Sequence, residues 1–217
     1  MNQIRPFKSE LAIDPCDLPG VRIASSSDEL EQIHHKDTAM VLWRRAPNQY
    51  LVDWLEQLAP EQLPRTRTVL RPQDISDALT HVFETAGTPP SDARDALATD
   101  IRILASRFAE VTNAPYLRLR LDVVTTNACR RFHVDAITAR LICTYRGTGT
   151  QYGLSPDGSD PDVILTAETG APVLLRGSLW PEVPASGSLH RSPPIEGTDE
   201  TRLVLVLDPM DGPAEET

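Results

Sequence analysis

The sequence predicts an α+β protein in which an antiparallel β-sandwich or barrel is covered by helices from the N-terminal half. In the first half, apolar residues recur at spacings of three and four, which is the period of an amphipathic helix. From Tyr116 onward they alternate with polar residues, as in half-buried strands. Prolines are absent between Tyr116 and Gly153, so this stretch is predicted to form the central sheet. The 217 residues suffice for one large domain.

Charge and composition exclude several classes of partner. The chain carries 21 Lys and Arg against 31 Asp and Glu, a formal net charge of −10, and nucleic-acid binding depends on clustered cations. Three cysteines without a paired spacing give no disulfide framework and favour a reducing cytoplasm. The longest apolar runs, 39–43 and 203–207, are far shorter than the ~20 residues that cross a membrane. We therefore expect a cytoplasmic protein without nucleic-acid or membrane partners.

The N-terminal half is predicted to contain an arm and a helical part. Residues 1–27 form the arm and residues 28–112 the mainly helical part. Three principal helices are expected over 48–59, 73–86 and 91–111, each with one apolar face. Ser91 is a candidate N-cap for the third helix, and Gly87 ends the second. A short helix is also expected at 28–33, with short strands at 41–44 and 66–70.

The β core is predicted over residues 113–208, and an acidic tail over 209–217. Its first strand begins at Tyr116, where leucines at every second position alternate with Arg118, Arg120 and Asp122. Clusters of Gly, Pro, Asp and Ser separate the later strands. These strands are expected at 132–134, 137–145, 163–167, 172–175 and 203–207. The helices would pack outside one sheet of this core.

The segment around His133 and Asp135 is the strongest candidate for a functional site. Residues two apart in a strand point to the same side, so these two side chains would present an imidazole and a carboxylate together. His190, beyond a turn-rich stretch, is a candidate third ligand. Two histidines and one carboxylate leave open positions on a metal, as in non-haem Fe(II) oxygenases. The alternative is that His133 and Asp135 only pair with each other or with Arg131.

Two further residues bear on the chemistry of this site. Arg202 opens the last predicted strand, where its guanidinium could hold a carboxylate by two hydrogen bonds. Cys129 stands four positions before His133, which is a spacing found in zinc sites, and thiolates favour zinc. Cys129 is therefore a candidate ligand of a zinc site. Cys143 lies in an apolar run and is predicted to be a buried small hydrophobic residue.

The motif His133-x-Asp135, His190 and Arg202 resembles that of the iron(II) and 2-oxoglutarate-dependent dioxygenases. The resemblance spans residues 113–208 and implies a double-stranded β-helix, or jelly-roll, core. Three segments, 129–135, 144–150 and 190–194, resemble more closely a bacterial family called domain of unknown function 1826.

The dioxygenase resemblance implies a role for each matching residue. His133, Asp135 and His190 would bind Fe(II), and Arg202 would bind the distal carboxylate of 2-oxoglutarate. Arg140 and Tyr145 lie on opposite faces of one strand, so only one of them points inward. Tyr145 is the preferred second contact to 2-oxoglutarate, with Arg140 facing the helices or solvent.

Other residues are candidates for contacts to cosubstrate or substrate. Thr150 is a further candidate contact to 2-oxoglutarate, and Trp180 could wall the pocket near His190. Arginines near the predicted ligands form a basic patch that would attract an anionic substrate, or would form salt bridges with the acidic helices. This patch comprises Arg118, Arg120, Arg130 and Arg131, of which Arg131 is the candidate substrate contact.

Two other functions stay open. The same ligands, with or without Cys129, suit a non-catalytic, cupin-like metal-binding protein. The family resemblance implies a role in zinc homeostasis for such a protein, because family members are encountered beside genes for zinc homeostasis. A metal-dependent isomerase or hydrolase on the same barrel is the third possibility. The expected partner of an enzyme is a small-molecule substrate, and exposed barrel strands are compatible with a homodimer.

Overall fold

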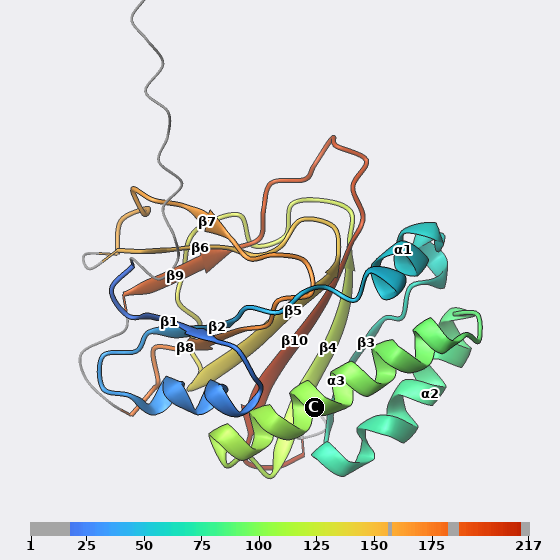
Figure 1. Ribbon diagram of the computed structural model, residues 1–217, viewed down its shortest axis with the longest axis horizontal. Helices are drawn as coiled ribbons and strands as arrows, with labels where there is room; N and C mark the ends of the chain where they lie inside the picture. The colour runs from blue at the N-terminus through green and yellow to red at the C-terminus, as the bar shows by residue number, and fades with distance from the viewer. Residues whose placement is uncertain (1–17, 156–157, 182–186, 214–217) are drawn as a thin grey trace, which may run out of the picture.

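The protein is described here by a computed structural model that covers residues 18–155, 158–181 and 187–213. Two β-sheets lie against each other, and helices cover the outer face of the larger sheet (Figure 1). The α+β class predicted from the sequence is confirmed. Residues 1–17 of the predicted arm and 214–217 of the predicted tail fall outside the described residues. Within the described residues, none of the helices is long and apolar enough to cross a membrane.

The larger sheet has seven strands in the order β1-β2-β8-β5-β10-β4-β3, and the smaller has three in the order β7-β6-β9. All pairs are antiparallel except β1 with β2. The strands are β1 Val21–Ala24, β2 Met40–Trp43, β3 Thr66–Leu70, β4 Tyr116–Val124, β5 Ala139–Arg146, β6 Gln151–Leu154, β7 Leu165–Thr166, β8 Val173–Arg176, β9 Ser188–Arg191 and β10 Arg202–Met210.

From β4 onward the chain alternates between the two sheets. It runs from β4 to a bridge beside β9, back to β5, then to β6 and β7, to β8, to β9 and finally to β10. Such alternation is the connectivity expected of a jelly-roll core. The strand predicted at 132–134 is reduced to that bridge, in which His133 pairs with His190.

The three principal helices agree with the sequence prediction to within a few residues. They are α1 Gln49–Gln57, α2 Ile75–Ala86 and α3 Asp92–Thr112, and the short 3-10 helices are η2 Asp28–His34, η3 Pro60–Gln62 and η4 Pro72–Asp74. The Ser91 side chain accepts a hydrogen bond from the backbone N–H of Arg94, which confirms Ser91 as the N-cap of α3. Gly87 ends α2 at φ 65°, a left-handed conformation that glycine adopts without strain.

The core has two parts, one on each face of the larger sheet. Odd-numbered residues of β4, β5 and β10, such as Leu119, Cys143 and Leu205, pack against α3 and the other helices. Even-numbered residues, such as Ile142 and Val204, pack against the smaller sheet. In β4, in β10 and in β5 as far as Thr144, the parity of a residue therefore decides whether it faces the helices or the space between the sheets. Arg146 follows a shift in the pairing of β5 with β10 and contacts α1.

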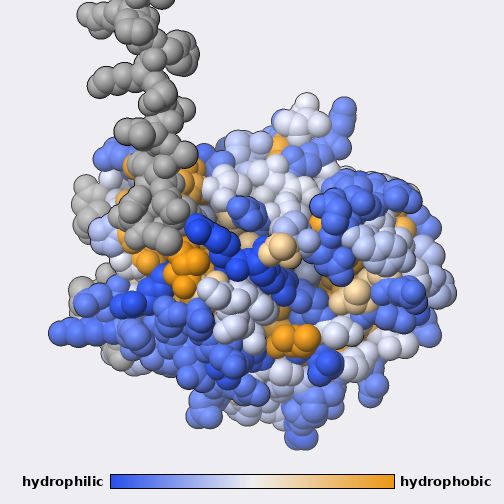
Figure 2. All heavy atoms as spheres, in the orientation of Figure 1, coloured by the Kyte–Doolittle hydropathy of each residue, from blue (hydrophilic) through white to orange (hydrophobic). Residues whose placement is uncertain are grey.

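The sequence analysis did not predict β1, β6 or β9. Each has only four residues, and none shows a long alternating pattern. β1 lies within the range assigned to the arm, where it pairs with β2. Apolar side chains form only small patches on the face shown in Figure 2. Within the described residues, the large hydrophobic side chains that stay exposed are Tyr50, Ile103, Ile164 and Leu179.

Candidate metal centre

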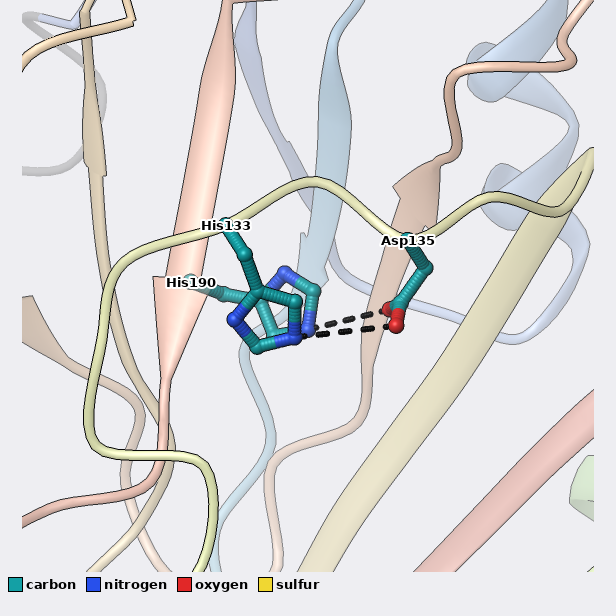
Figure 3. A group of neighbouring side chains, drawn as sticks. All are labelled: His133, Asp135 and His190. Atoms are coloured by element: carbon teal, nitrogen blue, oxygen red, sulfur yellow. Dashed lines mark ion pairs between the residues drawn. The ribbon is translucent and has the colours of Figure 1, made fainter.

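His133, Asp135 and His190 meet between the two sheets, although they come from different segments (Figure 3). His133 and Asp135 lie in the loop between β4 and β5, and His190 lies in β9. The backbones of His133 and His190 exchange two hydrogen bonds of 3.1 Å, which brings the two side chains together. One ligand atom of each residue lies within 4.8 Å of those of the other two. The structure thus brings together the three predicted ligands.

The ring of His133 is oriented for metal binding. Its Nδ1 lies 2.9 Å from the carbonyl oxygen of Arg131, and a carbonyl can only accept a hydrogen bond. The proton of a neutral ring therefore resides on Nδ1, and Nε2 keeps a free lone pair. Nε2 lies 3.6 Å from Asp135 Oδ1, inside the triad. A carbonyl that holds the outer nitrogen of a ligating histidine is a common feature of metal sites.

The two oxygens of the Asp135 carboxylate have different surroundings. Oδ1 accepts a hydrogen bond from Arg140 Nη1. Oδ2 is buried, lacks a hydrogen-bond partner among the described residues and lies 3.1 Å from His190 Nε2. A buried carboxylate oxygen without a donor is costly unless a cation completes its surroundings. Two imidazole nitrogens and this oxygen fit a divalent metal such as Fe(II) or Zn(II).

The protonation states of the triad also suit a metal. Burial lowers the pKa of the His190 imidazole, against the opposing effect of Asp135. Burial alone would raise the pKa of Asp135, but His190 and the Arg140 guanidinium outweigh it and hold that pKa below the ordinary value. A neutral imidazole and an ionised carboxylate are the forms that bind metals.

Close backbone packing holds the loop that carries Asp135. The N–H of Ser178 donates to the Asp135 carbonyl at 2.8 Å, and the N–H of Gly177 donates to the Thr138 carbonyl at the same distance. A Cβ at position 177 would lie 1.9 Å from the carbonyl oxygen of Ile137, so only glycine allows this approach. The segment after β8 thereby positions a predicted metal ligand.

Arg140 links the triad to a buried carboxylate, contrary to the prediction that it faces the helices or solvent. Its Nε and Nη2 donate to the two oxygens of Asp208 at 2.6 and 2.9 Å, while Nη1 donates to Asp135. The Asp208 side chain is 2% exposed. Arg140 has even parity in β5, and this places it between the sheets.

Tyr145 lies on the opposite face of β5, so the prediction that it points inward to a cosubstrate is wrong. Its hydroxyl donates to Asp100 Oδ2 of α3 at 2.7 Å. Arg45 donates to both oxygens of the same carboxylate at 2.6 and 2.7 Å. Tyr145 is buried in the helix-facing core, and burial raises the pKa of its hydroxyl well above the ordinary value. The prediction that Arg140 and Tyr145 lie on opposite faces was correct, but their assignment was reversed.

Arg202 is a buried cation that forms no ion pair with any of the residues the structure describes. Its residue is 1% exposed, and its guanidinium donates to the Thr148 carbonyl at 2.6 Å and to Thr144 Oγ1 at 3.3 Å. Among the described residues, no carboxylate oxygen lies within 4.0 Å of it. Burial lowers the pKa of Arg202 to about 10, since the charge of Glu200 compensates only in part. The Glu200 carboxylate instead accepts from the N–H and hydroxyl of Thr148.

The glycine-rich segment 144–150 explains how Arg202 is held. Gly147 has φ 78°, and a Cβ there would lie 2.9 Å from Arg202 Cγ. A Cβ at Gly149 would lie 1.8 Å from the carbonyl oxygen of Ala167. Gly147 therefore lets the chain pass close to the Arg202 side chain, and Gly149 lets it pass close to the backbone of Ala167 before β6 begins. Thr144 and Thr148 supply its acceptors.

A hollow of about 160 Å³ joins the two histidines of the triad to Arg202. Thr150, a predicted cosubstrate contact, lies in its wall. Apolar side chains from the space between the sheets form part of the wall and lower its polarity. The lining includes His133, His190, Arg202, Thr150, Ile142, Val204, Val206, Arg120, Arg140 and Cys129. The structure thus brings Arg202 and Thr150 to the same cavity as the two histidines.

Two predicted substrate contacts lie elsewhere. Trp180 packs on Arg176 at 4.8 Å and near the His34 ring at 5.4 Å, against the helix-facing core rather than in the hollow. Its assignment to the pocket wall is therefore wrong. The Arg131 side chain is exposed and lines, with His133, a separate depression outside the hollow, while its carbonyl lies 2.9 Å from His133 Nδ1. Its contact with a substrate stays a prediction. Both residues were chosen because they are near a predicted ligand in sequence. Nearness in sequence does not determine whether a side chain points into the hollow.

The cysteines do not complete the triad. Cys129 is exposed in the rim of the hollow, and its sulfur is not part of the group of ligand atoms within 4.8 Å. Cys143 is fully buried on the helix-facing side, where burial raises the pKa of its thiol to about 12. The prediction that Cys143 is a buried small hydrophobic residue is confirmed. The ligand set of the structure is one carboxylate and two imidazoles.

Comparison with known proteins places the fold in a class. The structure of dioxygenase for auxin oxidation 1 from Arabidopsis thaliana, in its binary complex with 2-oxoglutarate, matches 91% of this chain and 95% of its own, with a TM-score of 0.51 and 8% identity. The dioxygenase for auxin oxidation of rice matches 89% of this chain and 83% of its own, with a TM-score of 0.49 and 10% identity. The protein thus shares the fold of dioxygenase for auxin oxidation 1.

The family follows from the sequence. Residues 24–208 match the family described as Protein of unknown function (DUF1826), and the chain belongs to that family. A comparison with curated proteins gave no match in sequence. The family resemblance inferred from 129–135, 144–150 and 190–194 is therefore confirmed, and all three segments lie at the site.

Proposed function

We propose that the protein is a non-haem Fe(II) oxygenase that depends on 2-oxoglutarate and acts on a small molecule. One observation carries the proposal: the two histidines of a His-Asp-His triad share a cavity with a buried guanidinium that has no carboxylate partner among the described residues. The triad supplies the ligands of a facial iron site. The guanidinium of Arg202, which has no carboxylate partner within the described part of the chain, would supply a binding point for a carboxylate.

The metal bound by the triad and the guanidinium of Arg202 would have different roles. When bound, Fe(II) would supply the redox chemistry by which dioxygen oxidises a substrate while 2-oxoglutarate is converted to succinate and carbon dioxide. Arg202 would hold the distal carboxylate of 2-oxoglutarate, and Thr144 and Thr148 keep its guanidinium in place. The buried environment strengthens this ion pair because little water competes for it. Thr150 offers a hydroxyl in the same wall.

The first experiment is an anaerobic titration of metal-free protein with Fe(II) and then with 2-oxoglutarate. An Fe(II)–2-oxoglutarate chelate is expected to give a visible charge-transfer band. Changing Arg202→Ala should weaken 2-oxoglutarate binding at least tenfold and leave Fe(II) affinity unchanged. His133→Ala and His190→Ala should abolish metal binding. Arg102→Ala, an exposed change on α3, is the control for lost charge.

The outcomes of this titration distinguish the proposal from its alternatives. Binding of Zn(II) or Fe(II) without any response to 2-oxoglutarate would replace it with metal handling. Retention of metal by both histidine variants would show that the triad is not the metal site. If both Fe(II) and 2-oxoglutarate bind, oxygen consumption that depends on 2-oxoglutarate would identify an oxygenase even before its substrate is known.

A further inference from the structure

The hollow beside the triad is rich in arginine although the chain as a whole is acidic. Its lining includes four arginines and one aspartate, in a protein with a formal net charge of −10. Arginines gathered in a low-dielectric cleft raise the local concentration of anions. The four are Arg120, Arg140, Arg191 and Arg202, and the aspartate is Asp122.

Three of the four guanidinium groups already have acceptors. Arg140 and Arg202 donate to the groups described above, and Arg191 Nε donates to Gln151 Oε1 at 2.8 Å. Arg120 differs, because its Nε is buried and has no hydrogen-bond partner within the described part of the chain. Its side chain is only 19% exposed. A donor buried in this way requires an acceptor from outside the protein or remains costly.

The nearest carboxylate does not satisfy Arg120. Its Nη2 lies 3.9 Å from Asp208 Oδ2, which is beyond hydrogen-bond distance. Arg140 already donates to both Asp208 oxygens, and Arg118 also lies 3.9 Å away. Arg140 also donates to Asp135, so Asp208 and Asp135 together face three guanidinium groups. Within ion-pair distance, the guanidinium groups described around Asp208 therefore outnumber the carboxylates by one.

Arg120 and Arg202 serve different ends of the hollow. Arg120 pairs with Val206 of β10, four residues along the strand from Arg202, which corresponds to about 13 Å at 3.3 Å per residue. The guanidinium of Arg120 leans toward Asp208, whereas that of Arg202 leans toward Thr148. The two cations therefore do not converge on one carboxylate.

We propose that Arg120, assisted by Arg118, binds the anionic group of the substrate, so that the substrate is a small carboxylic or phosphoric acid. Naming this ligand the substrate rests on the proposed oxygenase function, but the anion site itself does not. The sequence left open whether these arginines attract an anion or pair with the acidic helices. They have even parity in β4, and their only ion pairs among the described residues are to Asp208 on the site face.

The test uses full-length protein loaded with Zn(II), which prevents turnover, and saturated with 2-oxoglutarate. Propionate and methylphosphonate serve as probes, 1-propanol is the uncharged control, and calorimetry measures their dissociation constants. We expect at least one of the two anions to bind, while 1-propanol does not. Arg120→Gln should weaken that binding about tenfold or more. Arg120→Lys should have a smaller effect, because it keeps the charge but not the planar fork.

Matched variants keep the test decisive. Arg102→Gln removes the same charge from the exposed face of α3 and should leave anion binding unchanged. Arg118→Gln, at 32% exposure, should weaken binding by a smaller factor, and it replaces Arg120→Gln if that variant does not fold. Equal anion affinity in the Arg120 and Arg102 variants would overturn the inference, as would a failure of both anions to bind the parent protein.

Two further outcomes separate this inference from the proposed function. If Arg120→Gln loses 2-oxoglutarate binding instead of probe binding, Arg120 belongs to the cosubstrate site and the inference is wrong. If the parent protein binds no 2-oxoglutarate but binds a probe through Arg120, the oxygenase proposal fails and the anion site stands.

Discussion

At the residue scale, the Asp135 carboxylate shows how the site is organised. Its Oδ1 accepts a hydrogen bond from Arg140, which also donates to Asp208. Its Oδ2 lies on the side of the two imidazoles, 3.1 Å from His190 Nε2. Residues that orient a metal ligand in this way contribute to affinity without touching the metal. The buried ion pairs of Arg140 with Asp208 and Asp135 thus orient the carboxylate of a predicted metal ligand.

We expect Arg140→Met to lower metal affinity about 10- to 100-fold, because Asp135 loses the donor that orients it. Chelator competition with Zn(II) measures this affinity. The variant should also be less stable by about 1–3 kcal/mol, since Asp208 would be left with only the more distant Arg118 and Arg120. Arg102→Met, on the exposed face of α3, provides the control. Unchanged metal affinity with reduced stability would assign Arg140 a purely structural role.

The cysteines allow a second prediction at this scale. In a Cys16→Ser background, a thiol reagent at pH 8 should label Cys129 rapidly, because it is exposed. Cys143 should react only on unfolding, since it is buried and its thiol pKa is raised to about 12. Cys129→Ser should leave Zn(II) affinity unchanged within twofold. A large loss of Zn(II) affinity in that variant would add a thiolate to the ligand set.

At the scale of elements, β5 separates two hydrogen-bond networks. Its even-numbered residues Arg140, Ile142 and Thr144 face the site, and its odd-numbered residues belong to the helix-facing core, where Tyr145 joins Asp100 and Arg45. Arg146 lies beyond a shift in the pairing with β10 and contacts α1 instead. The sequence predicted the two faces of β5 from its period. It could not assign them, because which face meets the helices depends on pairing and packing between segments far apart in the chain. The same limit applies to Trp180.

The strand faces lead to a prediction for Tyr145→Phe. Loss of the hydroxyl should reduce stability by about 1 kcal/mol, because Asp100 loses one of its hydrogen bonds while Arg45 remains. The affinity for 2-oxoglutarate should not change, since the side chain lies on the other face of the sheet. Chemical denaturation and the anaerobic titration measure the two quantities. A tenfold loss of 2-oxoglutarate affinity at unchanged stability would contradict the assignment.

The contact between the end of β8 and the loop of Asp135 leads to another prediction. Gly177→Ala should destabilise the protein by about 1–3 kcal/mol, because a Cβ there meets the Ile137 carbonyl at 1.9 Å. It should also weaken Zn(II) binding, since the loop that carries Asp135 has to move. Gly212→Ala is the matched control, as nothing lies within 4 Å of its Cβ position. Full metal affinity in a destabilised Gly177→Ala protein would show that the loop adjusts independently.

At the scale of the whole molecule, the metal centre joins parts that the sequence keeps apart. Two ligands come from a loop between strands of the larger sheet and one from the smaller sheet, and the backbone bridge between His133 and His190 connects them. The motif predicted the ligands because their residue types are characteristic. It did not reveal Arg140, Asp208 or Arg120 as neighbours, since a charged residue in an alternating strand looks the same on either face.

This arrangement predicts that a bound metal stabilises the whole molecule, because the ion adds bonds between two segments that otherwise meet through hydrogen bonds such as those of His133 with His190 and of Cys129 with Ser192. At a Zn(II) concentration of a hundred times Kd, binding to the folded state alone adds about 2.7 kcal/mol. For a chain of this length, that gain raises Tm by about 5–10 °C. Hydrogen exchange at the His133 and His190 amides should slow in parallel. The double variant His133→Ala, His190→Ala should show neither effect, and an undiminished rise in Tm in that variant would place the metal elsewhere.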